Sequence, residues 1–486
     1  VRDITTTSLL GASIAHDIYV VIFKIPNVFR NAFGEGALNQ AFIPIYSDFL
    51  NKGDELKTRE FLNAVSGFLI TALFFFTLFV LIFAPIFVLI FAPGFYFDPI
   101  KKELSVEVLR IMFPYLALIS LVAFAAGIQN SHNKFSIPAV TPLIFNLSLI
   151  CSAWLVAPRI EIPVMALAWG VLLAGFLQLL FQIAPLATIK KIPVPKIDFQ
   201  NPGVKKFFIL VLPAIIAGGI AQINLLVDTI FASLLITGSP TWLYVSDRLI
   251  QFPMGIFAIA IGTVLLPSLS KAYAQKEIEA FTDQLAHAFK LIFFLAIPSL
   301  IGLILFASPL LATIFQRGAF LWIDVQQASL SLIGFAFGLP FFMAMKVLVP
   351  AFFSRQNTKT PMLIALLSLL INISLNYLLA FYFELGHLGL AIASSISAIV
   401  SVIILSIILK REGLISFSGI LSAFSFKVLT ASVALIVFLL IFNQHFDFEL
   451  FTQAQRLIYL CVAVIGSIIT YFGVSFLLGV RATDFR

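Results

Sequence analysis

The chain has 486 residues and a formal net charge of +7, and its composition excludes an ordinary soluble protein. Residues of the A, V, I, L, M, F, W, Y and C set make up 61% and charged residues only 11%, whereas soluble domains carry about 25% charged residues. The two cysteines, Cys151 and Cys461, lie in apolar runs, which excludes a disulfide framework and a zinc motif. We therefore expect an all-α polytopic membrane protein, whose positive charge reflects loop topology rather than nucleic-acid binding.

Apolar stretches long enough to cross a bilayer follow one another along the chain. A transmembrane helix needs ~20 mostly apolar residues. Residues 1–11 resemble the end of a helix that starts before the chain does, because Val1 is not a methionine and Arg2-Asp3 begins abruptly. The other stretches, between charged residues and Pro or Gly, are 13–48 (long and broken), 62–91, 106–130, 137–157, 162–186, 205–236, 242–270, 281–306, 326–352, 361–383, 388–409, 424–442 and 456–479. The sequence thus predicts fourteen transmembrane helices, the first of them truncated.

The positions of lysine and arginine predict the orientation of these helices. Cytoplasmic loops of membrane proteins are enriched in both residues. Most of those in this chain fall in loops at the ends of even-numbered helices, and few fall in the opposite loops. We therefore predict that both termini are cytoplasmic.

A polar connection, roughly residues 187–206, divides the chain and carries five lysines and three prolines. The Gly- and Pro-interrupted segment 26–47 also has an out-of-register counterpart at 253–270. Such interruptions in two halves indicate a transporter's central site, although tolerated proline kinks explain each of them alone. We predict two pseudo-symmetric six-helix lobes at 1–186 and 205–410, a cytoplasmic linker at 187–204, and two further helices within 411–486.

Ionisable residues gather in the first two predicted helices and the eighth. A charge at mid-bilayer costs about 3 kcal/mol on insertion scales, so it faces a cavity or a partner. Arginine forks match phosphate or carboxylate oxygens, which makes a cluster of cations a candidate anion site. The alternative is a set of mutually neutralised structural pairs. The cations are Arg2, Lys24, Arg30 and Arg248, and the acids are Asp3, Asp17, Glu35 and Asp247.

A smaller polar set suggests a candidate Na⁺ site. Asp228 lies alone in an apolar stretch, and Asn372 and Asn376 share a helix face at i, i+4. With the hydroxyls of Ser394 and Ser395, they offer the oxygen ligands that hard cations prefer. Interhelical hydrogen bonding by Asn and Ser is the alternative. No cofactor other than Na⁺ is expected.

Enzymatic motifs are absent from the sequence. The five histidines are scattered without metal-ligand spacing, and there is no Walker A loop, GxSxG elbow or HExxH motif. No predicted loop has room for a catalytic domain. The sequence therefore predicts a transporter driven by an ion gradient or by the membrane potential.

The stretch from Asp17 to Pro44 resembles a known signature. Its pattern D…F-K-I-P-N…R…F-G-E-G-A…Q-A-F-I-P is similar to that of the MurJ (MviN) family, the lipid II flippases of bacterial peptidoglycan synthesis. The resemblance covers nearly the whole chain. Its further segments are Phe91–Phe95, Asn133–Pro138, Ser246–Ser270 and Phe353–Pro361.

The resemblance implies the MOP (multidrug/oligosaccharidyl-lipid/polysaccharide) fold, alternating access, an inner-membrane location, and a groove for a lipid tail formed by the two C-terminal helices. It implies a monomer whose partners are membrane lipids and lipid II, which carries a diphosphate between a C55 prenyl chain and a disaccharide–pentapeptide. By motif position, the cavity or portal residues would be Arg2, Asp3, Asp17, Arg30, Glu35 and Arg248, with Lys24 as a further cavity cation.

Two other functions compete with this one. A related MOP flippase for other polyprenyl-linked oligosaccharides, or a cation-coupled drug exporter, would share the fold, but an exporter of cationic drugs calls for cavity anions. An integral-membrane enzyme acting on polyprenyl phosphate would need an acidic metal motif or a catalytic histidine in a loop, and the sequence offers neither.

Overall fold

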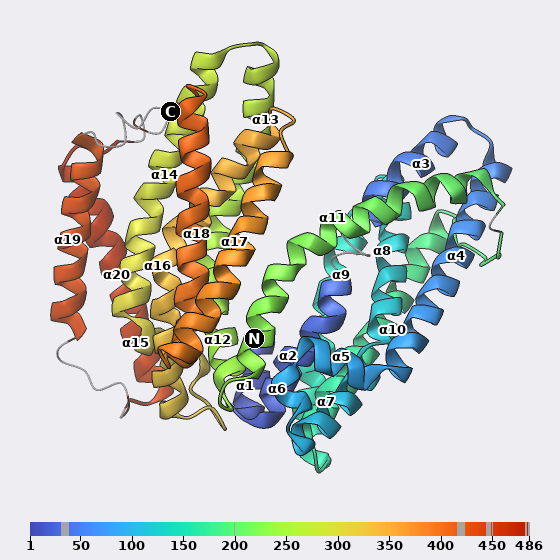
Figure 1. The fold of residues 1–486 in the computed structure, drawn as a ribbon, viewed down its shortest axis with the longest axis horizontal. Helices are drawn as coiled ribbons and strands as arrows, with labels where there is room; N and C mark the ends of the chain where they lie inside the picture. Colours follow the sequence, from blue (N-terminus) through green and yellow to red (C-terminus); the bar gives the residue numbers. More distant parts are fainter. Residues whose placement is uncertain are drawn as a thin grey trace. The chain divides into compact units, whose positions relative to one another are not determined.

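The structure is a computed structural model, and it describes residues 1–30, 38–198, 200–415, 423–443, 449, 451–481 and 484; the side chains of 39, 40, 212–221, 223–225 and 423 fall outside this description. Every regular element within these residues is helical (Figure 1). The helices pack into two compact units, Val1–Thr241 and Trp242–Arg486.

The first unit contains helices α1 to α11, and α9 continues into a π-helical and a 3₁₀ turn. Proline occupies the first turn of five of these helices, where its missing N–H costs no hydrogen bond. The helices are α1 (Arg2–Leu10), α2 (Ile14–Arg30), α3 (Asn39–Asn51), α4 (Glu55–Ile82), α5 (Ala84–Phe91), α6 (Pro93–Tyr96), α7 (Pro99–Met112), α8 (Tyr115–Ser131), α9 (Ser136–Cys151), η2 (Ser152–Val156), η3 (Ala157–Arg159), α10 (Pro163–Thr188) and α11 (Pro202–Ser233).

The second unit contains most of α12 and the helices after it. Two π-helical turns interrupt its long helices, one directly after Pro253 and one at the end of α17. The helices are α12 (Ser239–Pro253), η4 (Met254–Ala258), α13 (Ile259–Ala274), α14 (Ile278–Leu305), α15 (Ala307–Phe315), α16 (Trp322–Phe353), α17 (Lys359–Tyr377), η5 (Leu378–Tyr382), α18 (Gly386–Arg411), α19 (Ala423–Asn443) and α20 (Gln453–Leu477).

Aspartate caps show how local sequence sets helix starts. The Asp54 side chain accepts a hydrogen bond from the Lys57 main-chain N–H at the start of α4, and Asp98 accepts two at the start of α7. The hydrogen bonds from Lys57 hold the pKa of the Asp54 carboxyl below its usual range. These caps place charged residues at helix ends, where water can reach them.

The first unit has an aromatic core between α3, α4 and α8. Phe42, Tyr46, Phe61 and Phe124 are almost completely buried. The ring centroids of Phe42 and Phe124 are 4.9 Å apart in an edge arrangement, a geometry that aromatic pairs prefer. The phenylalanine-rich composition therefore serves helix packing as well as the lipid-facing surface.

Close main-chain approaches in the second unit rely on small residues. Gly389 of α18 lies against η5, and a Cβ atom there would be 2.7 Å from the Ala380 main-chain nitrogen. In addition, the Ser395 hydroxyl donates a hydrogen bond of 2.7 Å to the Gly334 carbonyl of α16. Small and hydroxylated residues at helix contacts are typical of membrane bundles.

Helices α19 and α20 are anchored to α14 within the second unit. The Tyr471 hydroxyl of α20 donates a hydrogen bond of 2.7 Å to the Phe294 carbonyl of α14. The same contact is surrounded by buried Val428, Leu435 and Ala463. The last two helices are thus an integral part of this unit.

Eleven of the described helices are long and apolar enough to cross a membrane. Their length and composition make the chain a multi-pass membrane protein. The predicted count of fourteen is not established by these eleven, and it stays a prediction. In the region predicted as one long broken span at 13–48, α2 and α3 have only 17 and 13 residues.

The division into compact units differs from the predicted lobe boundary. The sequence pattern places the stretch 205–236 in the second lobe. In the structure it belongs to the first unit, and α11 contains it up to Ser233. A hydrogen bond of 3.2 Å from the Gly94 main-chain N–H to the Ser233 hydroxyl ties the end of α11 to α6. The linker 187–204 lies inside the first of these compact units, and the predicted lobe boundaries stay a prediction.

Candidate functional site

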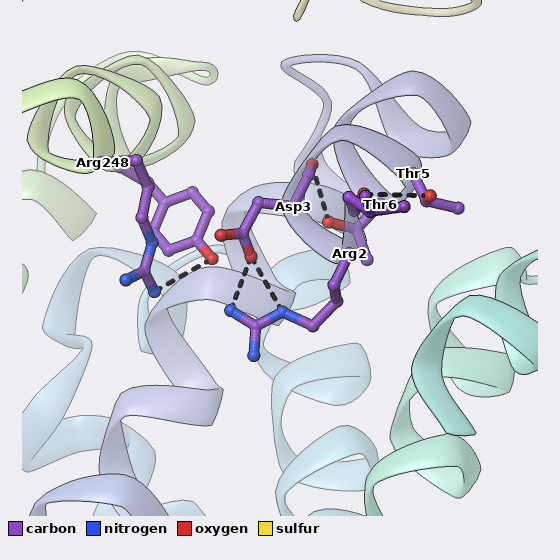
Figure 2. Close-up of polar contacts among 7 residues, drawn as sticks. Arg2, Asp3, Thr5, Thr6 and Arg248 are labelled. Atoms are coloured by element: carbon purple, nitrogen blue, oxygen red, sulfur yellow. Dashed lines mark hydrogen bonds and ion pairs between the residues drawn. The ribbon is translucent and has the colours of Figure 1, made fainter. Parts of the chain in front are cut away.

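Helix α1 presents an arginine held by its neighbour. The Arg2 Nε and Nη2 atoms both donate to Asp3 Oδ1, over 2.8 and 2.6 Å (Figure 2). The Arg2 guanidinium also lies 5.6 Å from the ring centroid of Phe145 in α9. Its side chain is 18% exposed. Arg2 is thus oriented by a carboxylate and an aromatic face, and part of its surface is open to a ligand.

Asp17 in α2 is a buried carboxylate with neutral hydrogen-bond donors. Its oxygens accept from the Gly238 main-chain N–H at 2.7 Å, and from the main-chain N–H and hydroxyl of Thr241 at 3.1 and 2.7 Å. The residue is 2% exposed. Through these contacts, Asp17 holds the turn between α11 and α12.

The two predicted site cations of α2, Lys24 and Arg30, are also oriented by polar neighbours. Lys24 donates a hydrogen bond of 2.9 Å to the Thr229 hydroxyl of α11, and the Arg30 Nε donates one of 2.9 Å to the Asn27 side chain. Pro26 lies between them inside the helix. Asp17 and Lys24 are seven residues apart and share a helix face. Glu35, the remaining predicted site residue of this region, lies outside the described residues.

Arg248 is the cation that the second unit contributes to the predicted site. It is exposed on α12, and its guanidinium lies 4.8 Å from the ring centroid of Tyr244, one helical turn earlier. The Arg248 Nη2 also donates a hydrogen bond of 3.2 Å to the Tyr244 hydroxyl (Figure 2). Tyr244 was not singled out from the sequence, although its i, i+4 spacing to Arg248 is a signal that could have identified it.

The predicted Na⁺ ligands are divided between the two units. Asp228 lies on α11, whereas Asn372, Asn376 and Ser395 lie on α17 and α18. The Asn376 amide donates to Asn372 Oδ1 at 3.1 Å, the Asn372 amide donates to the Ser394 hydroxyl at 3.3 Å, and Ser395 bonds the main chain of α16. The first of these hydrogen bonds lies within α17 and the other two join different helices. The Na⁺ site stays a prediction. The residues described contain no group of three His, Cys, Asp or Glu arranged to hold a metal.

The second unit also contains an apolar pocket between α14, α19 and α20, with η4 on one side. Its lining carries only three hydroxyl groups, those of Ser299, Ser467 and Tyr471. The apolar lining includes Phe252, Ile256, Leu295, Leu303, Leu435, Leu439, Leu460, Val464 and Phe472. A chemically uniform pocket of this kind accepts a hydrocarbon chain rather than a polar group.

A buried polar cluster near the start of α12 was missed by sequence reasoning. The Trp242 indole donates a hydrogen bond of 3.1 Å to Asp324 of α16. The two ring nitrogens of His387 lie 2.7 Å from the Ser331 hydroxyl and 3.0 Å from the Gln327 side-chain oxygen. These partners are 56 to 82 residues apart in sequence, so no local pattern reveals them.

The all-helical architecture is the fold of MOP-type transporters. An inward-facing multidrug-resistance MATE transporter of that superfamily superimposes with a TM-score of 0.67 at 14% identity, over 85% of this chain and 93% of that one. A solved structure described as "Lipid II flippase MurJ, inward closed conformation" gives a TM-score of 0.80 at 26% identity, over 98% and 95% of the two chains.

Sequence comparison identifies the family within that class. The model of the family "Lipid II flippase MurJ" matches residues 6–459. A Vibrio cholerae serotype O1 protein named "Probable lipid II flippase MurJ" is 36% identical over 501 residues, which cover 100% of this chain and 94% of that protein. The chain belongs to the MurJ lipid II flippase family, which is a family of membrane transporters and not of enzymes.

Proposed function

We propose that this protein moves lipid II from the cytoplasmic to the periplasmic leaflet of the bacterial inner membrane by alternating access. The observation that carries the proposal is a set of cations, each oriented by a hydrogen bond on a helix of a largely apolar protein: Arg2, Lys24, Arg30 and Arg248. The bilayer interior strongly disfavours an unaccompanied diphosphate. Guanidinium groups substitute for water by donating charge-assisted hydrogen bonds to its oxygens.

The roles of the two ends of the substrate follow from the chemistry of the residues. The arginines hold the diphosphate, because their planar forks match its oxygens. The apolar pocket beside α19 and α20 takes the prenyl chain. A drug exporter that binds cations is disfavoured, since cations among the candidate site residues would repel such a substrate. Both termini are cytoplasmic in this proposal, and Na⁺ is the candidate coupling ion.

A complementation experiment tests the proposal. This protein should support growth of a strain depleted of its own flippase, and Arg248→Ala or Arg30→Ala should abolish growth at normal membrane expression. Arg248→Lys should be severely impaired, because lysine cannot form a bidentate contact. Lys271→Ala, at an exposed position of α13, is the matched control. Full growth with Arg248→Ala would exclude this residue from the site.

A further inference from the structure

A segment of the linker runs along α4 without forming a helix. Residues 190–197, called the strap here, follow α10, and residues 191–197 have no regular secondary structure. The main-chain N–H groups of Val194 and Lys196 donate to the side-chain and main-chain oxygens of Asn63, over 2.8 and 3.0 Å. A Cβ atom on Gly67 would be 2.2 Å from the Lys196 carbonyl oxygen. The strap is therefore fixed tightly against α4.

The strap is fixed near one end of the uncharged stretch of α4. No charged residue occurs in α4 from Phe61 to Ile82, a length of about 33 Å at 1.5 Å per residue. The hydrocarbon core of a bilayer is about 30 Å thick. Asn63 and Gly67 lie two and six residues into this uncharged stretch, so the strap lies about 3 to 9 Å inside its end.

The main chain of the strap is suited to that depth. Irregular backbone near the hydrocarbon is tolerated only where its polar groups are satisfied. Pro193 and Pro195 have no N–H, and the N–H groups of Val194 and Lys196 both bond to Asn63. Residues 193–196 therefore present no unsatisfied main-chain N–H group to lipid.

The strap carries apolar and cationic side chains, two kinds that fit the surface of a lipid bilayer. Ile192, Val194 and Ile197 are 43%, 59% and 66% exposed, although they stand on a firmly docked backbone. Lys196, between Val194 and Ile197, is exposed, and so is Lys190, which precedes them. Lys191 instead forms an ion pair of 3.1 Å with Glu55. Apolar side chains of this kind enter the interfacial layer, while the lysines extend toward headgroup phosphates.

We propose that the strap is a binding surface for an acidic phospholipid of the bilayer, distinct from the substrate site. The charge complementarity between the exposed lysines and a lipid phosphate selects this partner, and the exposed apolar side chains select a lipid rather than a soluble anion. The surface anchors the first unit to one leaflet at a fixed depth.

Spin labelling tests the depth of the strap. The full chain, with Cys151 and Cys461 replaced by serine, would carry a nitroxide at Val194→Cys in vesicles of phosphatidylcholine and phosphatidylglycerol. The label should collide more often with oxygen than with a water-soluble nickel complex. Gln275→Cys, in the exposed turn after α13, is the control and should show the reverse. Equal nickel accessibility at the two sites would overturn the proposal.

Lipid selectivity tests the charge of the strap. Binding of phosphatidylglycerol relative to phosphatidylcholine should fall about fivefold for each lysine removed in Lys190→Gln/Lys196→Gln at low salt. Lys271→Gln/Lys276→Gln removes the same charge elsewhere and should leave the selectivity unchanged. An equal loss of lipid selectivity in both double variants would show nonspecific attraction and reject the site. Displacement of the lipid by millimolar inorganic phosphate would also reject it. Neither readout depends on flipping, so failure of the proposed function leaves this test intact.

Discussion

Each cation of the candidate site is positioned by a specific neighbour. Asp3 orients Arg2, Thr229 orients Lys24, Asn27 orients Arg30 and Tyr244 orients Arg248. A long flexible side chain loses about 2 kcal/mol of rotamer entropy when it is fixed. A neighbour that already fixes this side chain lowers the entropic cost of binding a ligand.

Tyr244 provides a direct test of this positioning. Tyr244→Leu should lower the rate of flipping by about two- to fivefold, because a cation–π contact at an exposed site contributes about 0.5–1 kcal/mol. Tyr244→Phe keeps the aromatic ring, so its rate of flipping should lie between that of the parent protein and that of Tyr244→Leu. Flipping would be followed in proteoliposomes with a labelled lipid II.

The control for Tyr244 is Tyr377→Leu, which changes an exposed tyrosine of α17 and should have no effect. In a double-mutant cycle for the binding of a polyprenyl diphosphate, Tyr244→Leu should lose its effect in the Arg248→Ala background. An unchanged effect in that background would mean that Tyr244 acts independently of Arg248.

Asp17 is expected to control the turn between α11 and α12. In Asp17→Asn the amide cannot accept every hydrogen bond that the carboxylate accepts from Gly238 and Thr241, and a buried donor left unsatisfied costs about 1–3 kcal/mol. The variant should therefore be nonfunctional and should release this turn. A maleimide should label Ser239→Cys, which is fully buried, faster in the variant than in the parent protein.

The labelling control for Asp17 is a buried site in another helix. Ser475→Cys in α20 is 2% exposed and should react equally slowly in both proteins, with the native cysteines removed. Identical labelling of Ser239→Cys in the variant and the parent would refute a role for Asp17 in holding the turn.

At the scale of helices, close packing depends on glycines at positions where a larger side chain would not fit. Gly389 of α18 faces the main chain of η5, whereas a Cβ atom added to Gly473 of α20 would have no neighbouring atom within 4 Å. The two glycines have the same helix propensity, yet only one of them determines how closely two elements approach.

This pair predicts opposite effects of the same substitution. Gly389→Ala should lower the thermal unfolding temperature in detergent, because overpacking against main-chain atoms costs about 1–3 kcal/mol. Gly473→Ala should leave it unchanged or raise it, since alanine is favoured over glycine in a helix by up to about 1 kcal/mol. A stabilising Gly389→Ala would mean that α18 and η5 can separate without cost.

At the scale of the whole molecule, the candidate Na⁺ ligands lie on α11 of the first unit and on α17 and α18 of the second. If Asp228 and the Asn372/Asn376 pair bind Na⁺, the ion should stabilise the purified protein against heat in a saturable manner. K⁺ at the same ionic strength should do less, and Asp228→Asn should remove the difference. Equal shifts with both ions would favour a proton or the membrane potential as the driving force.

The sequence by itself determined the class of protein and the chemistry of its candidate site. The low content of charged residues required a membrane protein, because each intramembrane charge is costly and therefore rare. For the same reason the few remaining charges, such as Arg30 and Arg248, stood out without a structure. The motif from Asp17 to Pro44 indicated the family, and the match of the family model confirmed it.

Only the tertiary structure decided how these residues are held and which helices pack together. Asp17 meets Thr241 across 224 residues, and Lys24 meets Thr229 across 205. Hydropathy predicts which segments can lie in lipid. It does not predict which helices contact one another, since in a bilayer every helix is apolar. The packing of α11 with the first unit and the docking of the strap on Asn63 depend on such nonlocal contacts. A local pattern carries no information about them, because their free energy arises only when distant segments meet.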